Sequence, residues 1–339
     1  MELIEMKTET KYPVVCGQAF AQHNLADVFR KRLIQTRVAV ITDREVSGYY
    51  ANDFVCQFER IGIKPVLIVV DVSQSAKSID VVRYAYEKLT DVEFSPTDVL
   101  FALGGGGVMD VAAFVAATYQ KGIPYIQVPT SLLAMVDSSM STDAYLNFQS
   151  RKNQIGVTYS PEHVVIDTEY LKTLPPRVLS NGVAQAIQYG LLVDTELLSD
   201  LTSPHIDKAS LITKCLQARK QILSLDPTLL SFGQEIAEAI EGHFRFMKYS
   251  HGEALALGMF AIFPSQSLHA VYERHGLPYV LTGVSKDSLL KRIRKKFESK
   301  NNSVPLVRLS TAGKPVVEMI PVQELSVLYD AFLSNICRP

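Results

Sequence analysis

The sequence lacks several features that would assign it to a specialised class of protein. Its 339 residues carry a formal net charge of −1, whereas binding to nucleic acids or anionic membranes requires a strongly basic face. No apolar run approaches the roughly 18 residues that cross a bilayer. The opening MELIEMKTET also lacks the apolar core of a signal peptide. We therefore expect a soluble cytoplasmic protein with neither nucleic-acid nor membrane partners.

Cysteine is scarce as well, and no two cysteines form a CxxC pair. The wide spacing of the four predicts free buried or surface thiols in a reducing compartment. They are Cys16, Cys56, Cys215 and Cys337.

Short apolar runs alternate with amphipathic segments in the first half of the chain. Residues 37–43, 66–71, 99–105 and 125–130 are rich in β-branched residues and end at polar residues or glycine, as buried parallel strands do. Segments such as 79–91 and 111–120 between them have helical patterns. This alternation predicts a doubly wound, parallel Rossmann-like sheet. Residues 163–176 add one more strand and end at a proline pair.

Beyond this proline pair the pattern becomes mostly helical. We predict helices at 181–193, 210–225, 233–246, 254–270 and 286–297, and a pair of strands around the turn at 312–314. The sequence therefore predicts an α/β domain over residues 1–178 and a mostly α-helical domain over residues 179–339. A ligand would usually lie in the cleft between two such domains.

Two motifs are candidates for function. The segment LGGGGVMDVAAF (103–114) follows a strand and opens a helix, where glycines let the backbone approach a pyrophosphate and adopt positive φ. The same glycines are also compatible with a purely structural turn. In FGQEIAEAIE (232–241), Gln234 and Glu238 share one face of a helix shortly before the tripeptide HGE at His251. That helix could hold a metal, another ligand or nothing.

Residues 103–141, 166–177, 181–194 and 251–259 resemble, in the same order, segments of 3-dehydroquinate synthase and related sugar-phosphate cyclases. The resemblance implies an N-terminal NAD-binding domain, a helical domain with metal and substrate groups, and a homodimer. In that family NAD transiently oxidises a hydroxyl of a sugar phosphate, phosphate is eliminated, and the hydride returns. A divalent metal, usually zinc, polarises the reacting oxygen.

The resemblance implies two sets of site residues for a small-molecule substrate and its cofactor. The candidate catalytic residues are Lys152, Asn153, Lys220 and His251. The candidate NAD-binding residues are Asp43, Lys77, Gly104, Gly105, Gly106, Asp110, Thr130, Ser131 and Asp137. Met109 replaces a family glycine, which requires a negative φ at this position.

The metal-binding positions depart from the family pattern. The three family zinc ligands align with Gln185, Gln234 and His251, and a neutral amide oxygen is a weak zinc donor. We therefore expect no catalytic zinc, although Glu238, one turn from Gln234, could move in to restore a site. Two family lysines of the substrate pocket align with Gln188 and Asp143, which makes the pocket less favourable for an anion.

Three functions fit these features. The first is an NAD-dependent enzyme with cyclase-like or related redox chemistry on a less anionic sugar- or cyclitol-type substrate. The second is a non-catalytic homologue that keeps the fold and NAD binding and serves as a binding or scaffold partner. The third is a genuine 3-dehydroquinate synthase, a phosphate-eliminating lyase.

Overall fold

The computed structural model describes residues 2–6, 12–17, 25–33, 35–71, 77–149, 151–203, 206–298 and 302–337. The chain divides into two compact units, which we call unit 1 (residues 1–174) and unit 2 (residues 175–339). The division falls at a proline pair, where the long helix α9 (Pro176–Leu192) begins. Proline suits this position because the first residue of a helix has no intrahelical partner for an N–H group.

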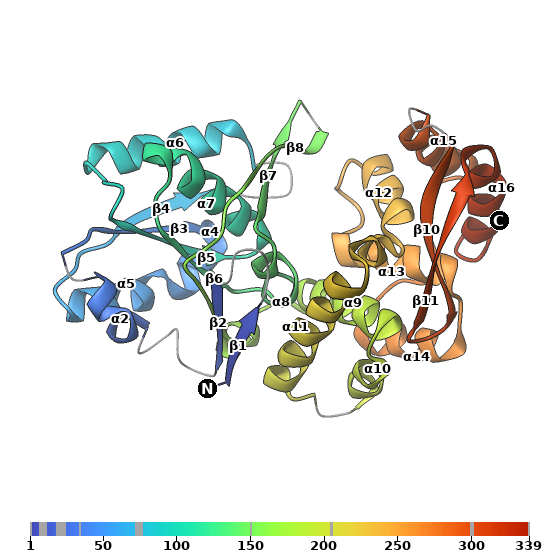
Figure 1. Cartoon of the computed structure of the whole chain (residues 1–339), viewed down its shortest axis with the longest axis horizontal. Coiled ribbons are helices and arrows are strands. Elements are labelled where there is room, and N and C mark those ends of the chain that lie inside the picture. The colour runs from blue at the N-terminus through green and yellow to red at the C-terminus, as the bar shows by residue number, and fades with distance from the viewer. Residues whose placement is uncertain are drawn as a thin grey trace. The chain divides into compact units, whose positions relative to one another are not determined.

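A sheet forms the centre of unit 1 (Figure 1). Among the described residues, seven strands pair in the order β1-β2-β9-β6-β5-β3-β4, and all neighbours are parallel except β1 and β2. This topology confirms the predicted Rossmann-like fold of the N-terminal half. The strands are β1 (Glu2–Met6), β2 (Tyr12–Gly17), β3 (Val38–Asp43), β4 (Val66–Val70), β5 (Val99–Gly104), β6 (Tyr125–Pro129) and β9 (His163–Asp167).

Helices cover both faces of this sheet because its strands are apolar on both sides. In β5, Leu100 and Ala102 join the core beneath α6 (Ile79–Asp91) and α7 (Gly106–Thr118). Phe101 faces the opposite side, and its ring centroid lies 5.1 Å from that of Phe58 in α5 (Asn52–Arg60). The shorter helices of unit 1 are α2 (Leu25–Val28), α3 (Arg30–Leu33), α4 (Arg44–Val46), η1 (Ser47–Ala51), η2 (Tyr119–Lys121), α8 (Leu132–Val136), η3 (Ser138–Met140) and η4 (Thr168–Lys172).

A β-hairpin follows β6 in unit 1. Its strands are β7 (Asp143–Phe148) and β8 (Arg151–Thr158), which pair antiparallel. Ala144 and Leu146 point into the core beside α7, while Asp143 and Tyr145 are exposed. These two strands were not predicted from the sequence, since only two side chains of β7 join the apolar core.

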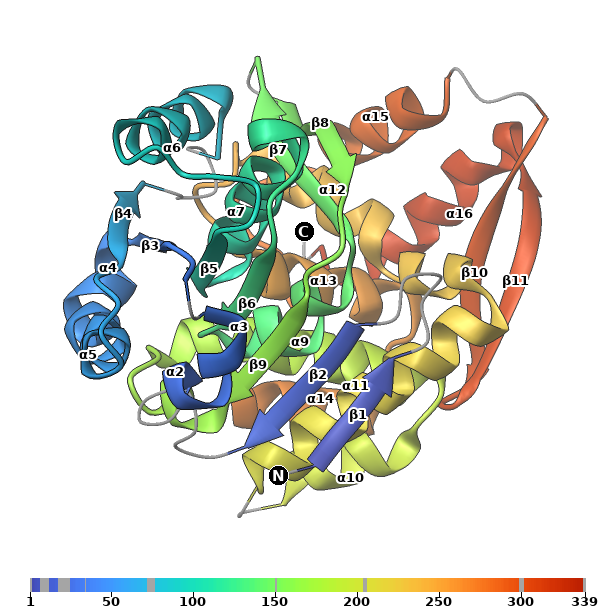
Figure 2. The same ribbon diagram turned by 60° about the vertical axis from the view of Figure 1, so that its left-hand side comes forward.

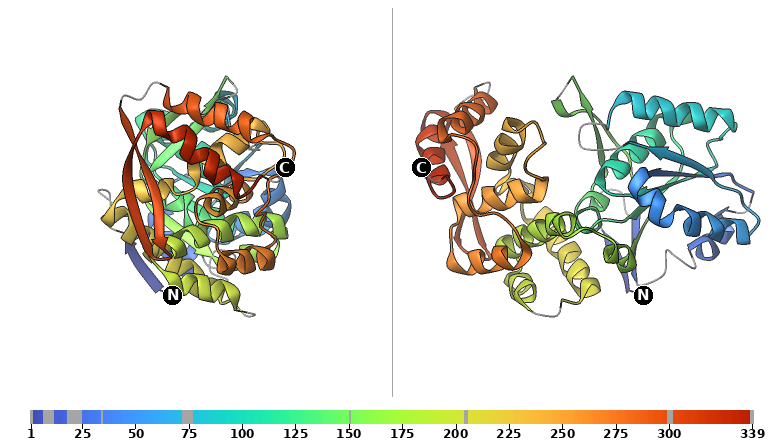
Figure 3. Two further views of the ribbon diagram at one scale, coloured as in Figure 1. Left: turned by 90° about the vertical axis from the view of Figure 1, so that its right-hand side faces the viewer. Right: turned by 180° about the vertical axis from the view of Figure 1, so that it is seen from behind.

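Unit 2 is mostly helical, as predicted, and carries one hairpin that lies beside α16 (Figures 2 and 3). The hairpin consists of β10 (Ser303–Thr311) and β11 (Lys314–Pro321), at the predicted turn. Besides α9, the helices are α10 (Thr195–Thr202), α11 (Lys208–Leu225), η5 (Pro227–Ser231), α12 (Gln234–His243), α13 (His251–Ile262), α14 (Gln266–His275), α15 (Lys286–Phe297) and α16 (Val322–Ser334).

The predicted single helix over residues 254–270 is wrong, because the structure divides this segment into α13 and α14. Pro264 lies between them and has no N–H group with which to continue the hydrogen-bond ladder. Ser265 then starts α14, since its hydroxyl accepts a hydrogen bond from the Leu268 N–H at 3.2 Å.

None of the helices in the described ranges is long and apolar enough to cross a membrane. The four cysteines are free thiols, with Cys16 and Cys215 buried and Cys56 exposed.

Candidate functional site

The carboxyl ends of β3 and β5 meet at the point in unit 1 where the order of the strands reverses. The chain continues from β3 to β4 on one side, and then crosses to β5 on the other side. Thr42 pairs with Leu103, so the next residues, Asp43 and Gly104, end their strands at the same level. Such a switch point is where open α/β sheets bind ligands.

The glycine loop lies at this switch point, and each glycine in it faces a different constraint. A Cβ atom on Gly104 would lie 2.4 Å from Val108 Cγ2, and one on Gly106 would lie 2.9 Å from Ser138 Oγ. A Cβ on Gly105 would reach Ser131 Oγ at 3.5 Å, an ordinary contact. A side chain would therefore fit at Gly105, whereas Gly104 and Gly106 must be small because Val108 and Ser138 pack closely against them.

The backbone of this loop corrects one expectation. None of the three glycines has positive φ, and Gly105 is extended with φ −80° and ψ −174°. They are needed for close approach of the backbone rather than for a left-handed conformation. The first turn of α7 has no side-chain cap among the described residues, which leaves amide groups available to an anion. Met109 is a buried residue within α7 and has negative φ, as its replacement of glycine requires.

Residues after β6 lie against the glycine loop. The Thr130 N–H donates to the Gly104 carbonyl oxygen at 2.8 Å, and Ser131 starts α8 by accepting from the Ala134 N–H at 3.3 Å. Asp137 ends α8 and directly precedes Ser138, the neighbour of Gly106. The structure thus gathers Thr130, Ser131 and Asp137 near the loop.

Asp110 in α7 pairs with Lys77, which lies just before α6. Lys77 Nζ donates to Asp110 Oδ2 at 2.5 Å, and the Tyr145 N–H donates to Asp110 Oδ1 at 3.3 Å. Burial raises the pKa of Asp110, while the charge and hydrogen bond of Lys77, the Tyr145 N–H and the charge of Lys152 oppose that shift. Lys77, Asp110 and the hairpin residue Lys152 therefore belong to one electrostatic group.

Three other candidates in unit 1 are placed by local hydrogen bonds. Asp43 accepts from the Val46 N–H at 2.8 Å and thereby caps α4. Asn153 is exposed with φ 54°, and its N–H donates to the side chain of Asn147 at 3.1 Å. Asp143 is exposed and accepts from the Thr158 hydroxyl at 2.7 Å.

In unit 2, Gln185 and Gln188 form a buried chain of amides on α9. Gln185 Nε2 donates to Gln188 Oε1 at 2.7 Å. Gln188 Nε2 in turn donates to the carbonyl oxygens of Leu230, at 3.1 Å, and Phe232, at 2.8 Å. This chain ties α9 to the segment that leads into α12.

The polar residues of α12 have separate partners. Gln234 is half-buried at the first position, after Gly233 with φ 83°. Glu238 is exposed and accepts from Lys296 Nζ at 2.7 Å. The carboxylate that lies next to His251 is instead Glu241, one turn further along and only 1% exposed. The sequence did not single out Glu241, because its place beside His251 depends on how α12 packs against α13.

His251 is the first residue of α13, and its Nδ1 lies 3.3 Å from Glu241 Oε1. With Glu241 ionised, this contact places the ring hydrogen on Nδ1 and leaves Nε2 with a lone pair. The imidazole can then accept a proton at Nε2.

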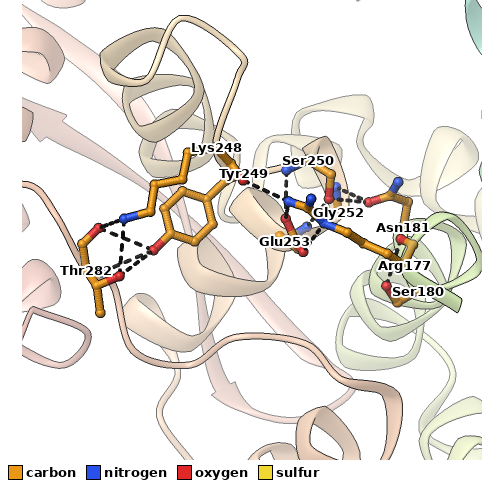
Figure 4. A network of polar contacts seen from close by, with 9 residues as sticks. All are labelled: Arg177, Ser180, Asn181, Lys248, Tyr249, Ser250, Gly252, Glu253 and Thr282. Carbon is orange, nitrogen blue, oxygen red and sulfur yellow. Dashed lines mark hydrogen bonds and ion pairs between the residues drawn. The ribbon is translucent and has the colours of Figure 1, made fainter.

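A network of hydrogen bonds fixes the start of α13, as Figure 4 shows. Arg177 donates from Nε and Nη2 to the two oxygens of Glu253, both at 2.7 Å, and these groups lower the pKa of Glu253 although its burial acts in the opposite direction. Asn181 Oδ1 accepts from the Ser250 hydroxyl at 2.6 Å and from the Gly252 N–H at 3.1 Å. This frame holds His251 between Ser250 and Gly252.

Lys220 lies half-buried on α11, which is a neighbour of α9. Its carbonyl oxygen accepts from the Ser224 hydroxyl at 2.9 Å, and the adjacent Arg219 donates to the Tyr189 hydroxyl of α9 at 2.9 Å. The backbone therefore places Lys220 beside the α9–α11 contact.

Models of the two domains of 3-dehydroquinate synthase match this chain, the N-terminal model at residues 67–181 and the C-terminal model at residues 182–296. The chain belongs to the 3-dehydroquinate synthase family. A 3-dehydroquinate synthase of Latilactobacillus sakei subsp. sakei (strain 23K) is 34% identical over 310 residues, covering 86% of this chain and 87% of that one. One of Streptococcus suis (strain 05ZYH33) is 31% identical over 314 residues, covering 85% and 88%.

Solved structures of other cyclases share the fold. A 2-deoxy-scyllo-inosose synthase complexed with carbaglucose-6-phosphate, NAD+ and Co2+ superposes with a TM-score of 0.80 at 21% identity, over 97% of this chain and 99% of that one. A 2-epi-5-epi-valiolone synthase from Streptomyces hygroscopicus subsp. jinggangensis 5008, with NAD+ and Zn2+, gives 0.79 at 21% identity, again over 97% and 99%. Both comparisons confirm the architecture of a Rossmann-like domain followed by a helical one.

The residues of this family member do not fit the metal that the family resemblance implies. Gln185 uses its amide nitrogen on Gln188, and Glu238 pairs with Lys296. Over the described ranges, no three His, Cys, Asp or Glu side chains are grouped so that they could hold a metal ion. Protein zinc sites use such ligands, whereas two of the three family positions here carry neutral amides.

Proposed function

We propose that this member of the 3-dehydroquinate synthase family binds NAD at the glycine loop of unit 1. We further propose that it transfers a hydride transiently to and from a sugar- or cyclitol-type substrate. This substrate would carry less negative charge than that of a zinc-dependent 3-dehydroquinate synthase. The observation that carries the proposal is the uncapped start of α7 at Gly106, located at the switch point between β3 and β5.

Several groups near that helix start suit a dinucleotide. The amides of Gly105 and Gly106 can donate to a pyrophosphate, and Lys77 brings a positive charge to α7 through its pair with Asp110. Asp43, which ends the neighbouring strand, keeps an oxygen with which to accept from a ribose hydroxyl. Bound NAD supplies the hydride acceptor.

The charge of the substrate-binding positions supports a less anionic ligand. Asp143 stands where the family resemblance implies a lysine, and its carboxylate already accepts from the hydroxyls of Thr158 and Tyr145, at 2.7 and 3.3 Å. A carboxylate accepts from hydroxyl groups and repels phosphate. The neutral Gln185 and Gln188 likewise add no positive charge in unit 2.

The chain also contains groups that can move a proton without a metal. His251 has a lone pair on Nε2 when Glu241 holds the hydrogen of Nδ1, and the Arg177–Glu253 network keeps the start of α13 in place. Lys152, near Asp110, is a second candidate. In this proposal these side chains exchange the proton of a substrate hydroxyl while the cofactor takes the hydride.

The test is rapid mixing of chelator-treated, NAD+-loaded protein with neutral cyclitols and unphosphorylated sugars. The expected result is a burst of NADH absorbance that decays as the hydride returns. In D2O, NMR should show deuterium on the carbon next to the oxidised one, because the transient carbonyl acidifies that C–H and the proton exchanges with solvent. NAD binding without any burst, for the whole panel and for phosphorylated sugars, would favour a non-catalytic homologue that keeps the cofactor. Failure to bind NAD would overturn the proposal in full.

A second candidate is 3-dehydroquinate synthase activity itself, favoured by the 34% identity to the Latilactobacillus protein of that name. Metal-dependent turnover of the seven-carbon sugar-phosphate substrate of that enzyme would establish it and remove the first proposal. A homodimer, expected from the family resemblance, is tested by sedimentation equilibrium, where a single-chain mass would contradict it.

A further inference from the structure

Gln185 and Gln188 are two amide side chains within the core of unit 2. They lie one turn apart on α9, and their exposed fractions are 2% and 0%. Burying an amide is unfavourable unless its donors and acceptors are paired. The partners of these two side chains therefore determine how each amide is oriented.

The orientation follows from the backbone of the neighbouring segment. The carbonyl oxygens of Leu230 and Phe232 can only accept hydrogen bonds, so the side-chain nitrogen of Gln188 faces them. It donates one of its two hydrogens to each oxygen. Gln188 Oε1 must then face Gln185, which presents its own nitrogen at 2.7 Å. Gln185 Oε1 consequently points away from Gln188, and no described group donates a hydrogen bond to it.

We propose that this one-way amide chain takes the place of a metal ion in unit 2. It ties α9 to the segment entering α12, and it leaves Gln185 Oε1 as a neutral acceptor reserved for a donor group such as a hydroxyl. This inference rests on the proposed function, in which no metal takes part, and adds that Gln188 positions the side chain of Gln185. Its test requires neither turnover nor NAD.

The direction of the amide chain predicts which substitutions at positions 185 and 188 are tolerated. A carboxylate at position 185 would set two acceptors, its own oxygen and Gln188 Oε1, against each other in a buried place. Turning Gln188 over would not help, because its oxygen would then face the carbonyls of Leu230 and Phe232. An ammonium at position 188 would resolve the conflict, since it donates to both carbonyls and to the carboxylate.

The experiment is a thermal-unfolding cycle with Gln185→Glu, Gln188→Lys and the double variant. We expect Gln185→Glu to lower the Tm by roughly 3–8 °C at neutral pH, and the double variant to recover at least half of that loss. Gln217→Glu, on an exposed position of α11, is the matched control and should change the Tm by less than about 2 °C. A Gln185→Glu protein as stable as the wild type, or a double variant no better than the single, would overturn the orientation.

Binding of added zinc tests the claim that the amide chain takes the place of a metal ion. After chelation and dialysis, added Zn2+ should leave the Tm of the wild type within about 1 °C and should not copurify in stoichiometric amount. One zinc per chain with a Tm rise of several degrees would overturn the replacement. NAD affinity is measured on the same samples, so intact NAD binding together with bound zinc would count against this inference and not against cofactor binding.

Discussion

The two units treat their polar groups in opposite ways. At the start of α7 in unit 1, no described side chain caps the backbone amides, and the Gly105 position has space beside it. In unit 2, the amides of Gln185 and Gln188 lie in the core and are mostly satisfied by the chain itself. Unit 1 therefore offers groups to a ligand, whereas unit 2 uses comparable groups for its own packing.

The difference between the two units shows that a cofactor and a metal depend on different parts of the chain. Backbone amides and glycines can receive a phosphate whatever side chains surround them, because the groups that bind belong to the main chain. A zinc site depends on three or four particular side chains, and two amides are enough to weaken it. Substitution of side chains can therefore weaken metal binding without changing the main-chain groups of a nucleotide loop.

The largest expected effect tests whether unit 2 is as tightly fixed as this comparison requires. A Cβ on Gly258 of α13 would lie 2.1 Å from the Gly233 carbonyl oxygen, a backbone atom that cannot move aside. We expect Gly258→Ala to lower the free energy of unfolding by about 3–4 kcal/mol, measured by urea titration. Gly242→Ala is the control, because its nearest neighbour is the flexible end of Arg292 at 3.2 Å. Equal stability of the two variants would mean that α12 and α13 separate easily.

The next prediction addresses the open site of unit 1. Gly105→Ala fits sterically, since its Cβ would reach Ser131 Oγ at 3.5 Å, but the methyl group would enter the space beside the helix start. We expect NAD affinity by calorimetry to fall about 10–100-fold, or ~1.4–2.7 kcal/mol, with little change in Tm. The Gly242→Ala protein should bind NAD as the wild type does. Unchanged affinity in Gly105→Ala would move the cofactor away from this loop.

A third variant probes the lysine–aspartate pair. Lys77→Met leaves the partly buried carboxylate of Asp110 without its cation, and we expect a loss of about 1–2 kcal/mol at pH 7. Burial already raises the pKa of Asp110 in the folded state, against the opposing effect of Lys77. The stability that this group contributes is therefore complete at low pH and is lost as pH rises through the folded pKa.

Removing Lys77 should make that dependence steeper. The difference between wild type and Lys77→Met should be small below about pH 4 and should grow towards pH 7. Lys77→Met/Asp110→Asn removes the carboxylate as well and should recover most of the loss. A difference that does not change with pH would show that Lys77 contributes through packing instead of charge.

The sequence predicted some parts of the molecule better than others, for physical reasons. Buried parallel strands such as β5 have a continuous apolar pattern, and the family motifs identified the family. The split at Pro264 was missed because the helical prediction was carried from the apolar run of α13 into the amphipathic α14, although Pro264 and the polar Ser265–Ser267 interrupt the pattern. Glu241 was missed because its importance depends on a contact with His251, ten residues away. The direction of the amide chain depends on the carbonyl oxygens of Leu230 and Phe232, which no pattern of side chains reveals.

The smallest expected effect concerns the frame around His251. Hydrogen bonds and charge from Arg177, with the Ser250 N–H, lower the pKa of Glu253 in spite of its burial. A lowered pKa means that this stabilisation is present above the unfolded pKa and is lost as pH falls through the folded one. Glu253→Gln should cost about 1 kcal/mol at pH 7, a modest value because Arg177 is largely exposed, and should flatten the stability profile below about pH 4.

Arg177→Met removes the other member of the Arg177–Glu253 ion pair. If the network only stabilises the fold, both variants should leave the imidazole of His251 unchanged in NMR spectra. If it also positions the ring, as the bonds that Asn181 accepts from Ser250 and Gly252 indicate, the ring signals should shift in both, and this is the result we expect. Asp287→Asn, exposed on α15, is the charge-removing control and should leave them unmoved. Unshifted ring signals in both variants, or an equal shift in the control, would contradict a positioning role for this network.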